Sequence, residues 1–225
     1  MAVAVLFDLE DTLVQTPWAD HQHVLEFRSK TRQKLIELGI PPSVLEGIER
    51  ATIMRNKSIE YIEKNLTKAE AEKIYQEMEK FLTYYELDSA NRSKLFPDTT
   101  PTLEKLRKLG VKMGIVTNTS MKAVNMVFRL HGLKGYFDAV VTRETVKKLK
   151  PDPEGILLAV NKLGATSFFV VGDHVRDALA ANSAKGKSIT VKRSSEEKID
   201  FQTDYVVQTL SEVPKIVATK RREEI

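Results

Sequence analysis

The sequence predicts an α/β protein in which a Rossmann-like parallel sheet is interrupted by an all-helical insertion. Six short apolar runs, rich in β-branched or aromatic residues, are typical of strands buried on both faces of a parallel sheet. From residue 97 onward these runs alternate with helical patterns, as in a doubly wound domain. The chain therefore divides into an α/β core of residues 1–14 and 97–225 and a helical insertion of residues 15–96.

The expected strands are bounded by polar residues or glycine. They lie at Ala2–Phe7, Val111–Val116, Phe137–Val141, Phe168–Val171, Ser188–Val191 and Tyr205–Val207. Most of the helices expected between them end shortly before a glycine, which is a common C-terminal signal. They lie at Thr102–Leu109, Met121–Leu130, Glu154–Leu163 and Arg176–Ala184.

The insertion is expected to contain helices and no convincing strand between residues 18 and 96. Amphipathic patterns place the helices at His23–Leu38, Ser43–Lys57 and Lys68–Tyr85. On the last helix, one face carries Ile74, Met78, Phe81 and Leu82. Such a stripe predicts the apolar core of the insertion rather than a cofactor site.

Composition excludes several classes of protein. The 225 residues are 42% hydrophobic and 29% charged, which favours a globular protein. The absence of cysteine excludes disulfides, thiolate catalysis and cysteine-bound zinc. The net charge of +4 is spread along the chain, so no nucleic-acid partner is expected. With no apolar run of membrane-spanning length and no basic leader, we expect a cytoplasmic protein without a membrane partner; its oligomeric state stays open.

Polar side chains follow three of the expected strands. In open parallel sheets, ligands bind at the carboxyl ends of the strands. The first strand is followed by Asp8 and Glu10, the second by Thr117 and Asn118, and the fourth by Asp173 and Asp177. Lys150, in the stiff segment Lys150–Pro153, adds a cation before a helix. The sequence thus predicts a site at this edge of the sheet.

These residue types suit phosphoryl transfer. Carboxylates such as Asp8, Asp173 and Asp177 are the hard oxygen ligands that Mg²⁺ takes. With a metal reducing charge repulsion, one carboxylate can attack a phosphoryl group, and a second acid, Glu10, can protonate the leaving oxygen. The phosphoryl oxygens can be held by Thr117, Asn118 and Lys150.

Four motifs occur in a fixed order: Phe7–Leu13, Ile115–Asn118, Lys150–Pro151 and Val171–Asp177. Because it carries these four motifs in this order, the chain resembles the haloacid dehalogenase-like (HAD) hydrolase superfamily, and in particular its phosphatases. The resemblance extends over residues 2–207. The helical insertion has the position and character of the family's C1-type cap domain, which closes over the site.

The resemblance implies a role for each matching residue. Asp8 would be the nucleophile that forms an aspartyl-phosphate, and Lys150 would stabilise it. Position 10 would supply the general acid/base and a backbone carbonyl to Mg²⁺. Asp173 would bind the metal, with Asp177 as a second acidic group, and Thr117 would bind phosphoryl oxygens. One position departs from the pattern, because family phosphatases usually have Asp where this chain has Glu10.

The expected function is Mg²⁺-dependent hydrolysis of a small phosphorylated metabolite. Glu10 motivates an alternative, a catalytically slow or inactive phosphate-binding or regulatory protein. Dehalogenation of a 2-haloacid ranks lower, because that reaction needs neither an acid at position 10 nor the acidic pair at Asp173 and Asp177. Two further residues stay open: Trp18 as a pocket wall or a hinge anchor, and His174 as a site residue or a polar loop residue.

Overall fold

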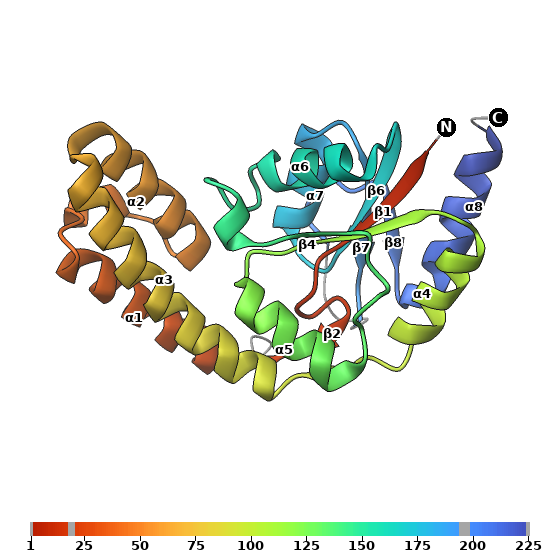
Figure 1. The fold of residues 1–225 in the computed structure, drawn as a ribbon, viewed down its shortest axis with the longest axis horizontal. Helices are drawn as coiled ribbons and strands as arrows, with labels where there is room; N and C mark the ends of the chain where they lie inside the picture. Colours follow the sequence, from red (N-terminus) through yellow and green to blue (C-terminus); the bar gives the residue numbers. More distant parts are fainter. Residues whose placement is uncertain (1, 18–20, 194–198, 224–225) are drawn as a thin grey trace.

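A computed structural model of the chain describes residues 2–17, 21–193 and 199–223. Figure 1 shows two parts, an α/β core that contains both ends of the chain and a helical cap at one side of it. Among the described helices, none is both long and apolar enough to cross a membrane. The predicted fold class is confirmed.

The core is built on one six-stranded sheet in which every strand pair is parallel. Its strands are β1 (Val3–Phe7), β4 (Lys112–Val116), β5 (Ala139–Val141), β6 (Ser167–Gly172), β7 (Lys187–Val191) and β8 (Tyr205–Val207). They match the six predicted runs. In the order β5-β4-β1-β6-β7-β8, the first strand lies between β4 and β6. The polar residues that follow these three neighbouring strands therefore meet at one edge.

Helices cover both faces of the sheet (Figure 1). One face packs against α4 (Thr99–Lys108), α5 (Met121–His131) and α8 (Val213–Glu223), and the other against α6 (Glu154–Leu163) and α7 (Val175–Ser183). Side chains alternate along β1 because successive residues of a strand point to opposite faces. Val5 and Phe7 join the first cluster and Leu6 joins the second.

The cap has its own apolar core. Its helices are α1 (His21–Glu37), α2 (Ala51–Asn65) and α3 (Lys68–Asn91), with a short 3₁₀ turn at Pro42–Leu45. The predicted stripe is confirmed as core, because Met78 and Leu82 are buried there with Ile74 and Phe81 packed against them.

The helix predicted over Ser43–Lys57 is wrong in its first half. After the 3₁₀ turn, Gly47 adopts a left-handed backbone with φ 68°, which ends helical winding. The second helix starts only at Ala51, and Arg50 occupies its N-cap position. This break has a consequence for the site, because it places the Arg50 side chain at the pocket.

The expectation of no strand in the insertion is also wrong at one place. Residues Lys94–Leu95 (β3) pair antiparallel with Val14–Gln15 (β2). Two-residue strands are too short to show an alternating pattern, and this pair forms only because the chain enters and leaves the cap at the same point. Phe96 N also donates to Leu13 O (3.2 Å), which holds both connections to the core.

Candidate active site

Asp8 lies where the central strand ends. Its backbone N–H donates to Val171 O of the neighbouring strand (2.9 Å), and Asp8 is only 2% exposed. Beyond it the chain turns sharply, because the N–H groups of Leu13 and Val14 both donate to Leu9 O. Asp11 takes the left-handed φ of 57° that this turn needs, which Asp tolerates better than most residues. The turn leaves the Asp8 carboxylate at the carboxyl edge of the sheet.

Three carboxylates gather at this edge. Asp8, Asp173 and Asp177 each offer an oxygen, and these oxygens lie within 4.8 Å of one another. The Thr12 hydroxyl donates to Asp173 Oδ1 (3.0 Å). A side chain at Gly172 would collide with Asp177, since an added Cβ would lie 2.4 Å from its Cγ. Glycine at this position therefore lets Asp177 reach the group.

Lys150 is the buried counter-charge of the carboxylates. Its Nζ lies 2.7 Å from Asp177 Oδ1, 2.9 Å from Asp8 Oδ1 and 2.7 Å from Val116 O. Burial alone would lower the pKa of Lys150, but the charges of Asp177 and Asp8 outweigh it and raise that pKa. The lysine is therefore positively charged and fixes one oxygen of Asp8.

Arg176 is a second cation at Asp8 that sequence reasoning missed. Its guanidinium NH2 lies 3.7 Å from Asp8 Oδ2, and the carboxylates raise the pKa of Arg176 despite burial. A signal for it was present in the sequence. A cation in the first turn of a helix is disfavoured by the helix dipole, so Arg176 between Asp173 and Asp177 indicates an acidic partner.

The donor set fits a divalent cation. Asp8 Oδ2 is buried and has no hydrogen-bond partner among the described residues. Burial, with the charges of Asp177 and Asp8, raises the pKa of Asp173 to about 7. By contrast, Asp177 uses both oxygens within the protein, one for Lys150 and one for His174 N (3.2 Å). The oxygens best placed for a cation are those of Asp8 and Asp173.

The second motif lies beside Asp8, because Phe7 pairs with Ile115 in the register of the two strands. Thr117 is 3% exposed, and its Oγ1 accepts from Thr119 N (3.3 Å). The Asn118 side chain instead pairs with the backbone of Lys150: Nδ2 donates to Lys150 O (3.1 Å) and Oδ1 accepts from Lys150 N (3.0 Å). The Asn118 side chain therefore orients the lysine segment, and both of its polar atoms are engaged there.

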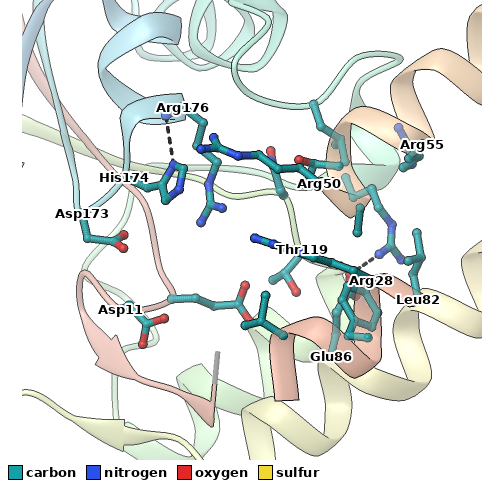
Figure 2. Close-up of a pocket in the computed structure, with 18 residues that line it drawn as sticks. Asp11, Arg28, Arg50, Arg55, Leu82, Glu86, Thr119, Asp173, His174 and Arg176 are labelled. Atoms are coloured by element: carbon teal, nitrogen blue, oxygen red, sulfur yellow. Dashed lines mark hydrogen bonds and ion pairs between the residues drawn. The ribbon is translucent and has the colours of Figure 1, made fainter. Parts of the chain in front are cut away.

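A pocket of about 250 Å³ lies between this edge and the cap (Figure 2). The core contributes Glu10, Asp11, Asn118, Thr119, Arg143, Leu149, Asp173, His174 and Arg176, and the cap contributes Val24, Phe27, Arg28, Arg50, Ala51, Thr52, Arg55, Leu82 and Glu86. Both possibilities for His174 hold, because it lines the pocket and its Nδ1 accepts from Arg176 N (3.2 Å). Burial and the charges of Arg176 and Arg50 lower its pKa to about 3, so His174 is neutral. Trp18 lies outside the described residues.

Arg143 joins the core to the cap. It is 1% exposed and forms ion pairs with Glu79 (2.7 Å) and Glu86. Its NH2 also donates to Thr83 Oγ1 (3.1 Å), and all three partners lie on α3. Glu86 in turn accepts from Ser120 N (2.9 Å), at the start of α5. Sequence reasoning missed these residues because their partners are distant along the chain.

A second set of contacts holds the segment before Lys150 against the cap. Arg55 NH1 donates to Lys147 O (3.1 Å). Asn56 pairs with the backbone of Leu149 in both directions, at 3.0 Å each. The lysine segment is thus held by an asparagine of the cap on one side and by Asn118 of the core on the other.

The fold and the pocket define an α/β enzyme with its site at the carboxyl edge of a parallel sheet. A family model described as haloacid dehalogenase-like hydrolase matches residues 3–185, and the chain belongs to this family.

Relatives and solved structures extend this match. Pyrophosphatase PpaX of Bacillus velezensis is 35% identical over 124 residues, which cover 53% of this chain and 57% of that protein. The chain thus matches little more than half the length of that relative. A phosphoglycolate phosphatase of Agrobacterium fabrum is 29% identical over 194 residues, covering 83% of this chain and 78% of that protein. The crystal structure of a HAD phosphatase from Thermococcus onnurineus is 28% identical with a TM-score of 0.61, covering 96% and 98% of the two chains.

Proposed function

We propose that the protein is a Mg²⁺-dependent phosphatase that hydrolyses a small phosphorylated metabolite through an aspartyl-phosphate on Asp8. The observation that carries the proposal is the Asp8 carboxylate, which is buried at the sheet edge with Oδ1 fixed by Lys150 and Oδ2 without a hydrogen-bond partner among the described residues. The phosphatases among the relatives support the same class of reaction.

In this proposal, Asp8 and Asp173 hold Mg²⁺ together with the backbone carbonyl of Glu10. When bound, the ion reduces the repulsion between the Asp8 carboxylate and an anionic phosphoryl group. Asp177 acts through Lys150 rather than as a direct ligand, since both of its oxygens accept from the protein. Asn118 likewise positions Lys150 with its side chain.

The reaction proceeds in two displacements. Asp8 forms a bond to phosphorus as the bond to the leaving oxygen breaks, and Glu10 gives that oxygen its proton. Glu10 then takes a proton from water, which attacks the phosphorus and releases inorganic phosphate with the Asp8 carboxylate restored. Throughout, Lys150 balances the charge near Asp8, while Thr117 and the backbone N–H of Asn118 hold phosphoryl oxygens.

The first test is hydrolysis of p-nitrophenyl phosphate with Mg²⁺, after chelation with EDTA, and after Mg²⁺ is restored. We expect turnover only when the metal is present, because the buried carboxylates otherwise repel the phosphoryl group. Undiminished turnover after chelation would contradict the proposal. Chloride release from 2-chloropropionate is measured alongside, and we expect none.

Glu10 decides between a working phosphatase and the slow or regulatory alternative. We expect Glu10→Gln to lower kcat by about 10²–10⁴-fold, the usual contribution of a general acid/base. Glu10→Asp keeps the carboxyl group and is expected to retain at least a tenth of the activity. If the wild type is inert and only Glu10→Asp turns over, the extra methylene has tuned this protein away from hydrolysis, and the alternative is correct.

A further inference from the structure

Two arginines of the cap line the pocket without a partner among the residues that the structure describes. Arg28 lies on α1, and Arg50 is the N-cap residue of α2, where its side chain forms no capping hydrogen bond. Neither forms an ion pair or hydrogen bond with any residue in the described ranges. The other arginines of the pocket are engaged: Arg55 with Glu79, Arg143 with Glu79 and Glu86, and Arg176 with Asp8. Within the described part of the chain, the charges of Arg28 and Arg50 are thus not neutralised by an ion pair.

A buried hydroxyl at the same pocket also lacks a partner. Thr119 is 2% exposed, and its Oγ1 has no hydrogen-bond partner within the described part of the chain. Buried polar groups are nearly always hydrogen-bonded, so this hydroxyl points to a ligand acceptor. In Figure 2, Arg50 extends from the cap toward His174 and Arg176, and Arg28 extends toward Thr119.

The position of these groups relative to Asp8 determines what they can bind. In the proposed function, the reacting phosphoryl group lies at Asp8 and Asp173 on the core. Arg28 and Arg50 belong to the cap, so they face the leaving group. The pocket volume of about 250 Å³ lies below the range of roughly 300–1,000 Å³ that is usual for ligand sites, which favours a small leaving group.

We propose that Arg28, Arg50 and Thr119 form a second anion subsite. The substrate is then a small phosphate ester or anhydride whose leaving group carries its own negative charge, a carboxylate or a phosphate. Guanidinium groups suit either, because their planar donors form paired hydrogen bonds with both kinds of oxyanion. The inference rests on the proposed function for the position of the reacting phosphoryl group.

The kinetic test compares charged and neutral leaving groups of similar size. 2-Phosphoglycolate and pyrophosphate carry the second charge, whereas 2-hydroxyethyl phosphate has a neutral hydroxymethyl group in place of the carboxylate. We expect the wild type to favour one or both charged substrates at least about tenfold in kcat/KM, and the preferred one identifies the second anion. Arg50→Met is expected to lower kcat/KM for that substrate by about 10- to 100-fold, the scale of one hydrogen bond to a charged group.

The neutral substrate and a matched arginine serve as controls. The Arg50→Met change is expected to alter kcat/KM for 2-hydroxyethyl phosphate less than about threefold, because that substrate has no second anion for Arg50 and the exposed Arg50 side chain forms no capping hydrogen bond. Arg92→Met removes the same charge at the C-terminal end of α3, from a residue that does not line the pocket, and is expected to affect no substrate. An equal loss on charged and neutral substrates in Arg50→Met would overturn the subsite.

Binding separates the subsite from the catalytic proposal. Calorimetric titration of Asp8→Asn protein with 2-phosphoglycolate, pyrophosphate and 2-hydroxyethyl phosphate in Mg²⁺ needs no turnover. A preference for a charged ligand that Arg50→Met and Thr119→Val each reduce supports the subsite even if the wild type hydrolyses nothing, in which case only the proposed function fails. Equal affinity for charged and neutral ligands overturns the subsite whether or not the enzyme is active.

Discussion

Asp8→Asn is expected to abolish hydrolysis of p-nitrophenyl phosphate, with kcat falling by roughly 10⁴-fold or more, the scale seen when a covalent nucleophile is removed. The amide has the shape of the carboxylate but is a poor nucleophile and carries no charge for Lys150 Nζ, which lies 2.9 Å from Asp8 Oδ1. The fold should survive, because Lys150 keeps its contacts with Asp177 and Val116. Steady-state kinetics measures the loss of activity, and circular dichroism verifies that the variant is folded.

The matched control for this variant is Asp88→Asn, the same substitution on an exposed residue of the cap. Its activity is expected to equal that of the wild type. If Asp8→Asn kept more than about a tenth of the wild-type kcat, another group would have to be the nucleophile. Labelling provides an independent check, since the wild type alone should acquire a phosphoryl group that hydroxylamine removes.

Arg143→Met is expected to lower the free energy of unfolding by about 3–5 kcal/mol. Arg143 is almost completely buried, and its loss leaves Glu86 as a buried carboxylate without its cation. Burial already raises the pKa of Glu86, with Arg143 opposing the rise. Removing the arginine therefore raises this pKa further and makes the ionised form costly. Urea denaturation measures the effect.

The pH dependence of this variant follows from the same shift. A carboxyl group whose pKa is higher in the folded than in the unfolded protein stabilises the fold at low pH and loses that contribution as pH rises. The deficit of Arg143→Met is therefore expected to shrink as pH is lowered from about 8 toward about 5. Adding Glu86→Gln should restore part of the stability at neutral pH, because the buried carboxylate that has lost its cation is then replaced by a neutral amide. A deficit below about 1 kcal/mol, or one independent of pH, would show that Arg143 has another role.

The sheet and the acidic edge could be predicted from sequence because both depend on local patterns. Strands buried on both faces are continuous apolar runs, and the residues after them necessarily lie at one edge once the strands are parallel. Asp8 and Asp173 were placed at this edge in this way, whereas Lys150 was proposed from its position in the proline-containing segment before a helix. The paired strands at Val14–Gln15 and Lys94–Leu95 were not, because two residues carry no periodicity.

Residues that act across the interface between cap and core escaped prediction for a different reason. Arg143 and its partners Glu79 and Glu86 are more than fifty positions apart, and nothing in the sequence near each one marks it as part of a pair. Arg50 was misplaced within a continuous helix, because the left-handed conformation of Gly47 depends on how the turn packs. That Arg50 lines the pocket became evident only in three dimensions.

Two asparagines connect the cap and the core through the short segment that ends at Lys150. Asn56 of the cap holds Leu149, and Asn118 of the core holds the next residue, Lys150. The hydrogen bonds between Asn56 and Leu149 therefore join the cap to the residue directly before Lys150. Lys150 in turn lies 2.9 Å from Asp8 Oδ1, so a single short segment connects helix α2 of the cap with the carboxylate at the end of the central strand.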